Sequence, residues 1–149
     1  MKRGPTPDEV AILQIAYEQA IYEVYLNRKT IQFRISDRCL AIDSLISQHG
    51  VDSWALITAY NPYSQCLSER NNQQRHQKLI EQIEGLQLAY LDAAGKDPGE
   101  IWQPELSLFI LGISRDIAIA IGRKFQQNAI VYGQIQQPVE LIWTDSESS

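Results

Sequence analysis

The spacing of hydrophobic residues along this 149-residue chain predicts a mixture of helices and strands. Apolar residues recur at helical spacing over residues 8–27 and 38–49, and they alternate with polar residues over residues 30–35. From residue 53 onward the pattern is regular. It predicts, in order, strand 54–60, helix 68–84, strand 86–91, strand 105–112, helix 115–126, strand 129–133 and strand 138–143.

The order of these elements predicts an α+β fold in which helices pack on a mixed β-sheet. Strand, helix, strand, strand, helix, strand is the order of the ferredoxin-like split βαβ arrangement. That order leaves one face of the sheet bare, and we expect the two N-terminal helices to cover it. No internal repeat or linker divides residues 1–149, so we expect a single domain with frayed ends at residues 1–7 and 144–149.

Composition narrows the classes of protein to consider. Hydrophobic residues make up 44% and charged residues 21%, which is typical of a folded domain and argues against disorder. A formal net charge of -5 disfavours nucleic-acid binding, because such proteins usually carry clustered Lys and Arg. The longest apolar run, residues 108–113, is too short to span a bilayer, so we expect no membrane partner.

The cysteines and histidines add little chemistry. Cys39 and Cys66 do not make the disulfide framework of a secreted protein, and the N-terminus lacks the apolar segment of a secretory signal. We therefore expect a soluble cytoplasmic protein. The scattered Cys and His residues have none of the spacings of a zinc site, and no nucleotide-binding motif occurs, so we expect no metal and no cofactor.

The junction after the first regular strand is the strongest candidate for a site. The apolar run stops at Asn61-Pro62, where the proline favours an extended backbone at Asn61, and the eleven residues of Ser68–Lys78 include no apolar side chain. Free N–H groups at a helix start suit an anion, and Asn71 and Arg75 share one helix face. We predict that Arg75 binds a carboxylate or phosphate here. The alternative is a solvated helix face whose polar residues bond to the preceding loop.

Other residues have an ordinary explanation beside a functional one. Glu105, at the start of a largely apolar strand, can act as an acid or base, or it can form a structural salt bridge with Arg75. Cys66 and His76 flank the polar helix start, but Arg75 and His76 point about 100° apart on a helix, which disfavours Cys–His catalysis. Trp102, in the long loop 92–103, either anchors that loop or stacks on a ligand.

Several short motifs, in one order, resemble a known family. They are ITAYNP at Ile57–Pro62, the polar-helix residues Asn71 and Arg75, Gly95, Pro104-Glu105 followed by Ser107, and FQQNAI at Phe125–Ile130. Over about Trp54 to Tyr132 the chain resembles the bacterial domain-of-unknown-function family 3293, although Gln126 stands where that pattern commonly has glycine. The resemblance implies a fold but no activity. It also implies a pocket with the polar residues Asn61, Asn71, Arg75, Glu105 and Gln127.

Three functions stay open at this point. The first is a binding module for a small anionic ligand, in which Arg75 holds the anion and neighbouring amides orient it. The second is an enzyme acting on a small polar metabolite, with Glu105 as general base. The third is an interaction protein with an exposed aromatic patch formed from Tyr60, Tyr63, Trp102, Tyr132 and Trp143. We rank binding first because the sequence contains no recognised catalytic constellation. Neither the ligand nor the oligomeric state follows from the sequence.

Overall fold

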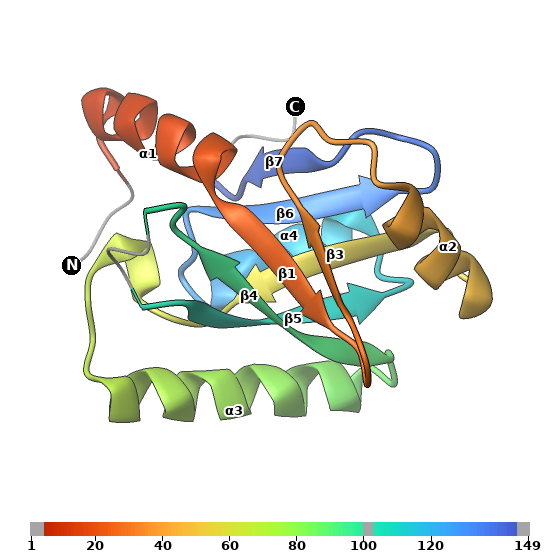
Figure 1. Ribbon diagram of the computed structural model, residues 1–149. Coiled ribbons are helices and arrows are strands. Elements are labelled where there is room, and N and C mark those ends of the chain that lie inside the picture. The colour runs from red at the N-terminus through yellow and green to blue at the C-terminus, as the bar shows by residue number, and fades with distance from the viewer. Residues whose placement is uncertain (1–4, 100–102, 146–149) are drawn as a thin grey trace.

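The computed structural model describes residues 5–99 and 103–145, which form one sheet with helices packed around it (Figure 1). The helices are α1 (Pro7–Gln19), α2 (Leu40–Gln48), η1 (Pro62–Ser64, a single 3₁₀ turn), α3 (Glu69–Gly85) and α4 (Arg115–Lys124). The strands are β1 (Ile21–Tyr25), β2 (Thr30–Phe33), β3 (Ser53–Thr58), β4 (Tyr90–Lys96), β5 (Glu105–Leu111), β6 (Ala129–Gln134) and β7 (Glu140–Trp143).

The seven strands stand in the order β2-β1-β4-β5-β3-β6-β7, and every neighbouring pair is antiparallel. The α+β class is therefore confirmed, whereas the expected mixed sheet is wrong. Strands β4, β5, β3 and β6 form the inner part of the sheet, and β1, β2 and β7 extend it at the two edges. The ferredoxin-like order stays a prediction for the inner strands of this larger sheet.

Two segments differ from the predicted elements. Residues 8–27, expected to be one helix, form α1 and then β1, because Tyr22 and Val24 are buried in the sheet whereas α1 buries no side chain. The strand expected over residues 86–91 begins only at Tyr90, because Gln87 adopts a left-handed backbone (φ 60°) that turns the chain after α3. Since β4 continues to Lys96, the following loop is shorter than expected.

The helices cover the two faces of the sheet unequally. Leu79 and Ile83 of α3 pack with Ala118 and Ile121 of α4 on one face. Ile117, also on α4, is exposed. Helix α2 packs on the opposite face through Ile42, Leu45 and Ile46. Helix α1 lies beside β7 instead, where Tyr17 meets Trp143 edge-on and Gln14 accepts a hydrogen bond from the same indole, so of the two N-terminal helices it is α2 that has the expected role (Figure 1).

Trp54 is at the centre of the core beneath α2. Its ring stacks on Phe109 with 4.9 Å between centroids and meets Phe33 edge-on at 5.2 Å. The ring also lies against the backbone of Gly133 on β6, so closely that a Cβ added there would overlap the indole. This close approach of ring and backbone requires glycine at position 133.

Residues near both ends of the described chain make specific contacts. Thr6 caps α1 in a capping box with Glu9, and Pro7 is the first residue of that helix. Thr144 is only 3% exposed, and its hydroxyl donates to the Gln127 carbonyl. Of the predicted frayed ends, residues 1–4 and 146–149 lie outside the described part of the chain.

Candidate functional site

Several predicted site residues meet around segment 59–61, which follows β3. The Arg75 Nε donates to the Ala59 carbonyl at 2.7 Å. The buried side chain of Gln127 donates to the Tyr60 carbonyl at 3.0 Å. Both side chains therefore hold the backbone just after β3, where the chain leaves the sheet.

Asn61 completes this arrangement with a backbone that differs from the prediction. Its φ of 49° and ψ of 67° are left-handed, although extended backbone was expected before Pro62. Its side-chain oxygen accepts from the Leu67 N–H at 3.0 Å and from Asn72 at 2.8 Å, and its amide donates to Glu105 at 2.8 Å. These bonds offset the cost of a positive φ, which asparagine tolerates better than most residues.

The helix residue in this network is Asn72 and not the predicted Asn71 beside it. Asn72 is 4% exposed, and its side-chain oxygen also accepts from the Asn61 N–H at 2.9 Å. Asn71 is exposed, and its backbone N–H completes the helix cap at Ser68. A signal for Asn72 was present, because the apolar stripe of α3 extended back seven residues from Leu79 reaches it.

Arg75 links three elements through oxygen acceptors. Besides Ala59, its guanidinium donates to the Phe125 carbonyl and, at 3.4 Å, to the side-chain oxygen of Gln126. The anticipated salt bridge to Glu105 is not among the ion pairs of the described residues. Burial lowers the pKa of Arg75, and none of these partners is a carboxylate that would compensate its charge.

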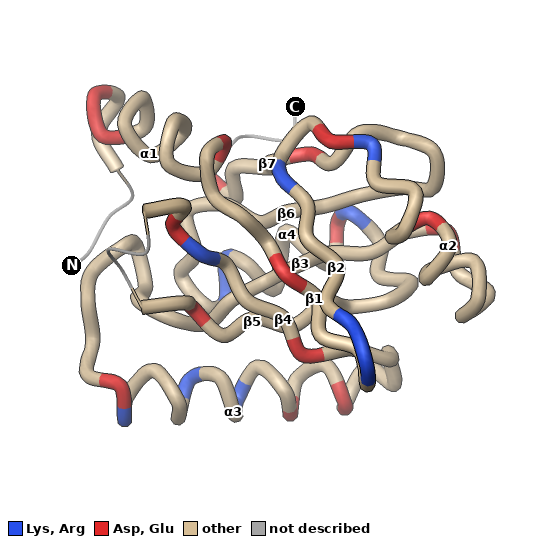
Figure 2. The backbone as a smooth tube through the Cα atoms, in the orientation of Figure 1, with Lys and Arg blue, Asp and Glu red and all other residues tan. Residues whose placement is uncertain are grey.

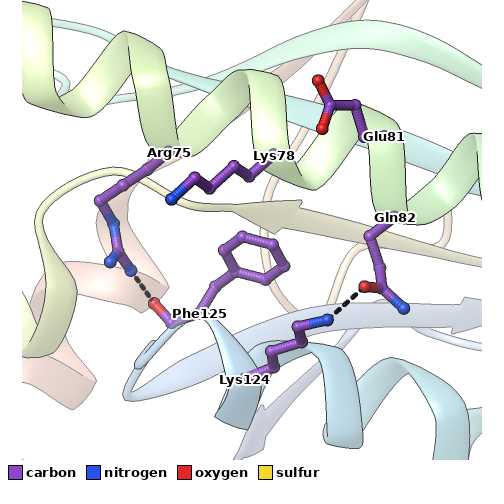
Figure 3. A pocket seen from close by; sticks show the side chains of 6 residues that line it. All are labelled: Arg75, Lys78, Glu81, Gln82, Lys124 and Phe125. Atoms are coloured by element: carbon purple, nitrogen blue, oxygen red, sulfur yellow. Dashed lines mark hydrogen bonds between the residues drawn. The ribbon is translucent and has the colours of Figure 1, made fainter.

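Arg75 also lines a groove of about 560 Å³ between α3 and α4 (Figure 3). Lys78 extends along α3 toward Arg75, whereas the Glu81 carboxylate points away from the Phe125 ring. Lys124 approaches from α4 and donates to the side chain of Gln82. The lining consists of Arg75, Lys78, Glu81, Gln82, Lys124 and Phe125, which is three cations and one carboxylate.

The charges along α3 agree with this placement (Figure 2). After Glu69 at its start, the helix carries Arg70, Arg75 and Lys78, and its acidic residues Glu81 and Glu84 follow nearer its end. The groove therefore lies beside a basic stretch of an otherwise acidic protein, whose formal net charge is -5.

Glu105 belongs to the network around Asn61 and does not line the groove. It is half-buried, and burial raises the pKa of its carboxyl, while the hydrogen bond from Asn61 opposes the rise. Its charge also acts on Tyr60, where burial first and the Glu69 hydrogen bond second raise the pKa to about 12. Glu105 is thus a carboxyl group in a setting that disfavours its ionised form.

The remaining candidates are dispersed. His76 faces Tyr60 edge-on at 6.2 Å, and burial lowers the pKa of its ring, with Asp92 opposing. Cys66 is exposed in the segment before α3. Tyr60 and Tyr132 are buried, so they do not contribute to an exposed aromatic patch. Trp102 lies outside the described residues.

The sequence that forms this site matches a known protein family. Residues 57–130 match a family model described as "Protein of unknown function (DUF3293)". The chain belongs to this family. The DUF3293 segment runs from the end of β3 to the start of β6, so it contains the network around Asn61 and the whole groove. No curated protein and no solved structure matches the chain.

Among residues 5–99 and 103–145, no helix combines the length and apolar character needed to cross a bilayer. The same residues contain no group of three or more His, Cys, Asp or Glu side chains able to hold a metal ion.

Proposed function

We propose that this DUF3293 protein binds a small anion in the groove between α3 and α4. The observation that carries the proposal is the way in which the guanidinium of Arg75 is hydrogen-bonded. Its guanidinium is held by the carbonyls of Ala59 and Phe125, and no carboxylate among the described residues forms an ion pair with it. Lys78 and Lys124 add two cations to the same groove. A carboxylate or phosphate would gain charge-assisted hydrogen bonds there.

The two kinds of cation have different roles in this proposal. Arg75 is preorganised, and its long 3.4 Å bond to Gln126 is the one most readily exchanged for a ligand oxygen. The C-terminal carbonyls of α4 lie beside Arg75 and partly offset its charge. The exposed Lys78 and Lys124 therefore supply most of the net attraction, and that attraction weakens with ionic strength.

The other two functions have less support. An enzyme using Glu105 as base on an anion in the groove is disfavoured, because Glu105 does not line it. An aromatic interaction surface is also disfavoured, because Tyr60 and Tyr132, two of its predicted members, are buried in the core. The cytoplasmic location rests on composition and cysteine usage and stays a prediction.

A thermal-shift screen at low ionic strength tests the proposal with inorganic phosphate, citrate and ATP. It compares wild type with the double variant Lys78→Gln/Lys124→Gln and with Lys29→Gln, which removes an exposed charge in the β1–β2 turn. A ligand at a hundred times its Kd stabilises the folded state by about 2.7 kcal/mol. We expect a shift for wild type and Lys29→Gln that is lost in the double variant. Equal shifts in all three proteins would refute the groove as the site.

A further inference from the structure

A second groove, of about 590 Å³, lies between the β1–β2 hairpin at the edge of the sheet and helix α2. Its floor is apolar, because Ile31 of β2 and Leu45 of α2 belong to the same core cluster and are each only 6% exposed. One wall is the turn of the hairpin, residues 26–29, and the other is the face of α2 that carries Ala41, Ser44 and Gln48. This hairpin groove shares no lining residue with the groove between α3 and α4.

The hairpin groove is positively charged. Arg28 and Lys29 of the turn both line it and are both exposed, and neither forms an ion pair among the described residues. No described Asp or Glu lines the hairpin groove. Two cations without a carboxylate, on a chain whose formal net charge is -5, are complementary to an anionic occupant.

Strand β2 presents unpaired backbone groups beside the hairpin groove, because it is the last strand at one edge of the sheet. The Leu26 N–H donates to the Lys29 carbonyl at 2.9 Å, and hydrogen-bonded pairs alternate along an antiparallel ladder, so the backbone of Ile31 bonds to β1. The backbone N–H and C=O groups of Thr30 and Gln32 therefore point to the free edge, and they have no backbone partner in the described part of the chain. Lys29 and Ile31, on either side of Thr30, line the groove, so the free edge adjoins it.

An exposed leucine extends the apolar part of this surface. Leu40 is 72% exposed at the start of α2, and it lies one helical turn before Ser44, which lines the groove. Alternate side chains of an extended chain point to the same face. A strand laid along β2 therefore directs every second side chain to the apolar surface between β2 and α2.

We propose that the hairpin groove binds an extended acidic peptide, which adds a strand to the sheet along β2. Its backbone pairs with the free N–H and C=O groups of Thr30 and Gln32, and its apolar side chains pack on the floor of the groove. Its carboxylates meet Arg28 and Lys29. In this mode of recognition the main-chain hydrogen bonds supply affinity, and the side-chain contacts supply specificity. Helix α2 forms the opposite wall, so the groove fits a single strand better than the sheet edge of a second copy of this chain.

Fluorescence anisotropy at low ionic strength tests this site with a dye-labelled peptide of alternating valine and glutamate. Arg28→Gln removes one cation of the groove, and Arg70→Gln, on the exposed first turn of α3, is the matched control. We expect equal affinity for wild type and Arg70→Gln, and about two- to fivefold weaker binding to Arg28→Gln. A peptide of alternating valine and lysine should not bind. Failure of the acidic peptide to bind wild type, or equal affinity for all three proteins, would overturn the proposal.

Two N-methylated forms of the acidic peptide test strand addition without changing the protein. One is methylated on the valine nitrogens and the other on the glutamate nitrogens. Because alternate residues of a strand present their N–H groups to the same neighbour, only one of the two forms loses the bonds to β2. We expect that form to bind at least about tenfold more weakly than the other. Equal affinities of the two forms would contradict pairing with β2.

A substitution in β2 gives a complementary test. Thr30→Pro removes an N–H that points to the free edge and takes no bond from β1, and edge strands accept proline at such positions. We expect weaker binding of the acidic peptide, with phosphate binding in the groove between α3 and α4 unchanged. Phosphate titrations on the same samples report on that groove separately, so either proposal can fail without the other. A wild-type dimer in light scattering that Thr30→Pro converts to a monomer would contradict the peptide proposal, because a second copy would then occupy the edge.

Discussion

Asn61 and Glu105 are joined by a 2.8 Å hydrogen bond from amide to carboxylate across 44 residues of sequence. The bond links the turn after β3 to the first residue of β5, two strands that are neighbours in the sheet. It helps to hold Asn61 in its left-handed conformation and gives Glu105 a donor that carries no charge. The fold of the turn and the ionisation of Glu105 are therefore coupled.

Replacement of Asn61 by glycine isolates what its side chain contributes. Glycine adopts the left-handed backbone freely, so Asn61→Gly removes the bonds to Leu67, Asn72 and Glu105 without adding strain. We expect a loss of about 1–3 kcal/mol in the free energy of unfolding, measured by urea denaturation. Asn61→Ala should cost more, because alanine disfavours positive φ. Wild-type stability in Asn61→Gly would mean that these bonds contribute nothing.

Glu105 should make the stability of the protein depend on pH in one direction. Its folded-state pKa is raised above the ordinary value of 4.5, so the folded state binds the proton more tightly than the unfolded state. Its contribution is therefore fully present below pH 4.5 and is lost as the pH rises through the raised value. We expect Glu105→Gln to become more stable relative to wild type, in unfolding free energy, as the pH rises over that window. A difference that is constant with pH would contradict the raised pKa.

Arg75 should stabilise the fold through geometry as well as charge. Arg75→Lys keeps the charge but cannot reach the Ala59 and Phe125 carbonyls and the Gln126 side chain together. We expect this variant to lose about 1–3 kcal/mol of unfolding free energy. Arg70→Lys, on the exposed first turn of α3, is the matched control and should change stability by less than about 0.5 kcal/mol. Similar stability of the two variants would make Arg75 an ordinary surface residue.

Gly133 should not tolerate even a methyl group. The added Cβ of Gly133→Ala would overlap the ring of Trp54, which is packed between Phe33 and Phe109 and has no room to move. We expect a loss of about 1–3 kcal/mol and a changed tryptophan fluorescence spectrum. At Gly85, where an added Cβ meets no atom within 4 Å, the same substitution should be neutral or stabilising. An unchanged fluorescence spectrum in Gly133→Ala would contradict the close packing.

Periodicity predicted the elements that bury a regular face. The nearly continuous apolar run of β5 reflects its position between β4 and β3, with buried side chains from Ser107 to Leu111. The same reasoning failed for residues 8–27, because the helical spacing continues into β1 while α1 itself buries nothing. Where no core enforces a pattern, spacing alone does not show where a helix ends.

The candidate site was only partly predictable for a related reason. Asn61, Arg75, Glu105 and Gln127 were named from the sequence, and the structure brings them around segment 59–61. Lys124 comes from a distant part of the chain, and only the packing of α4 places it in the groove beside α3. The spacing of residues within one segment does not predict such a tertiary neighbour.

The most direct test of anion binding is a ¹H–¹⁵N NMR titration of the wild-type protein with inorganic phosphate at low ionic strength. It reports where the anion binds without any substitution. We predict saturable shifts at the backbone amides of Lys78, Gln82 and Lys124 and at the Arg75 Nε–H, all of which weaken when salt is added. Shifts confined to other cations, such as Arg28 and Lys29, or no saturable shift at all, would contradict an anion site in this groove.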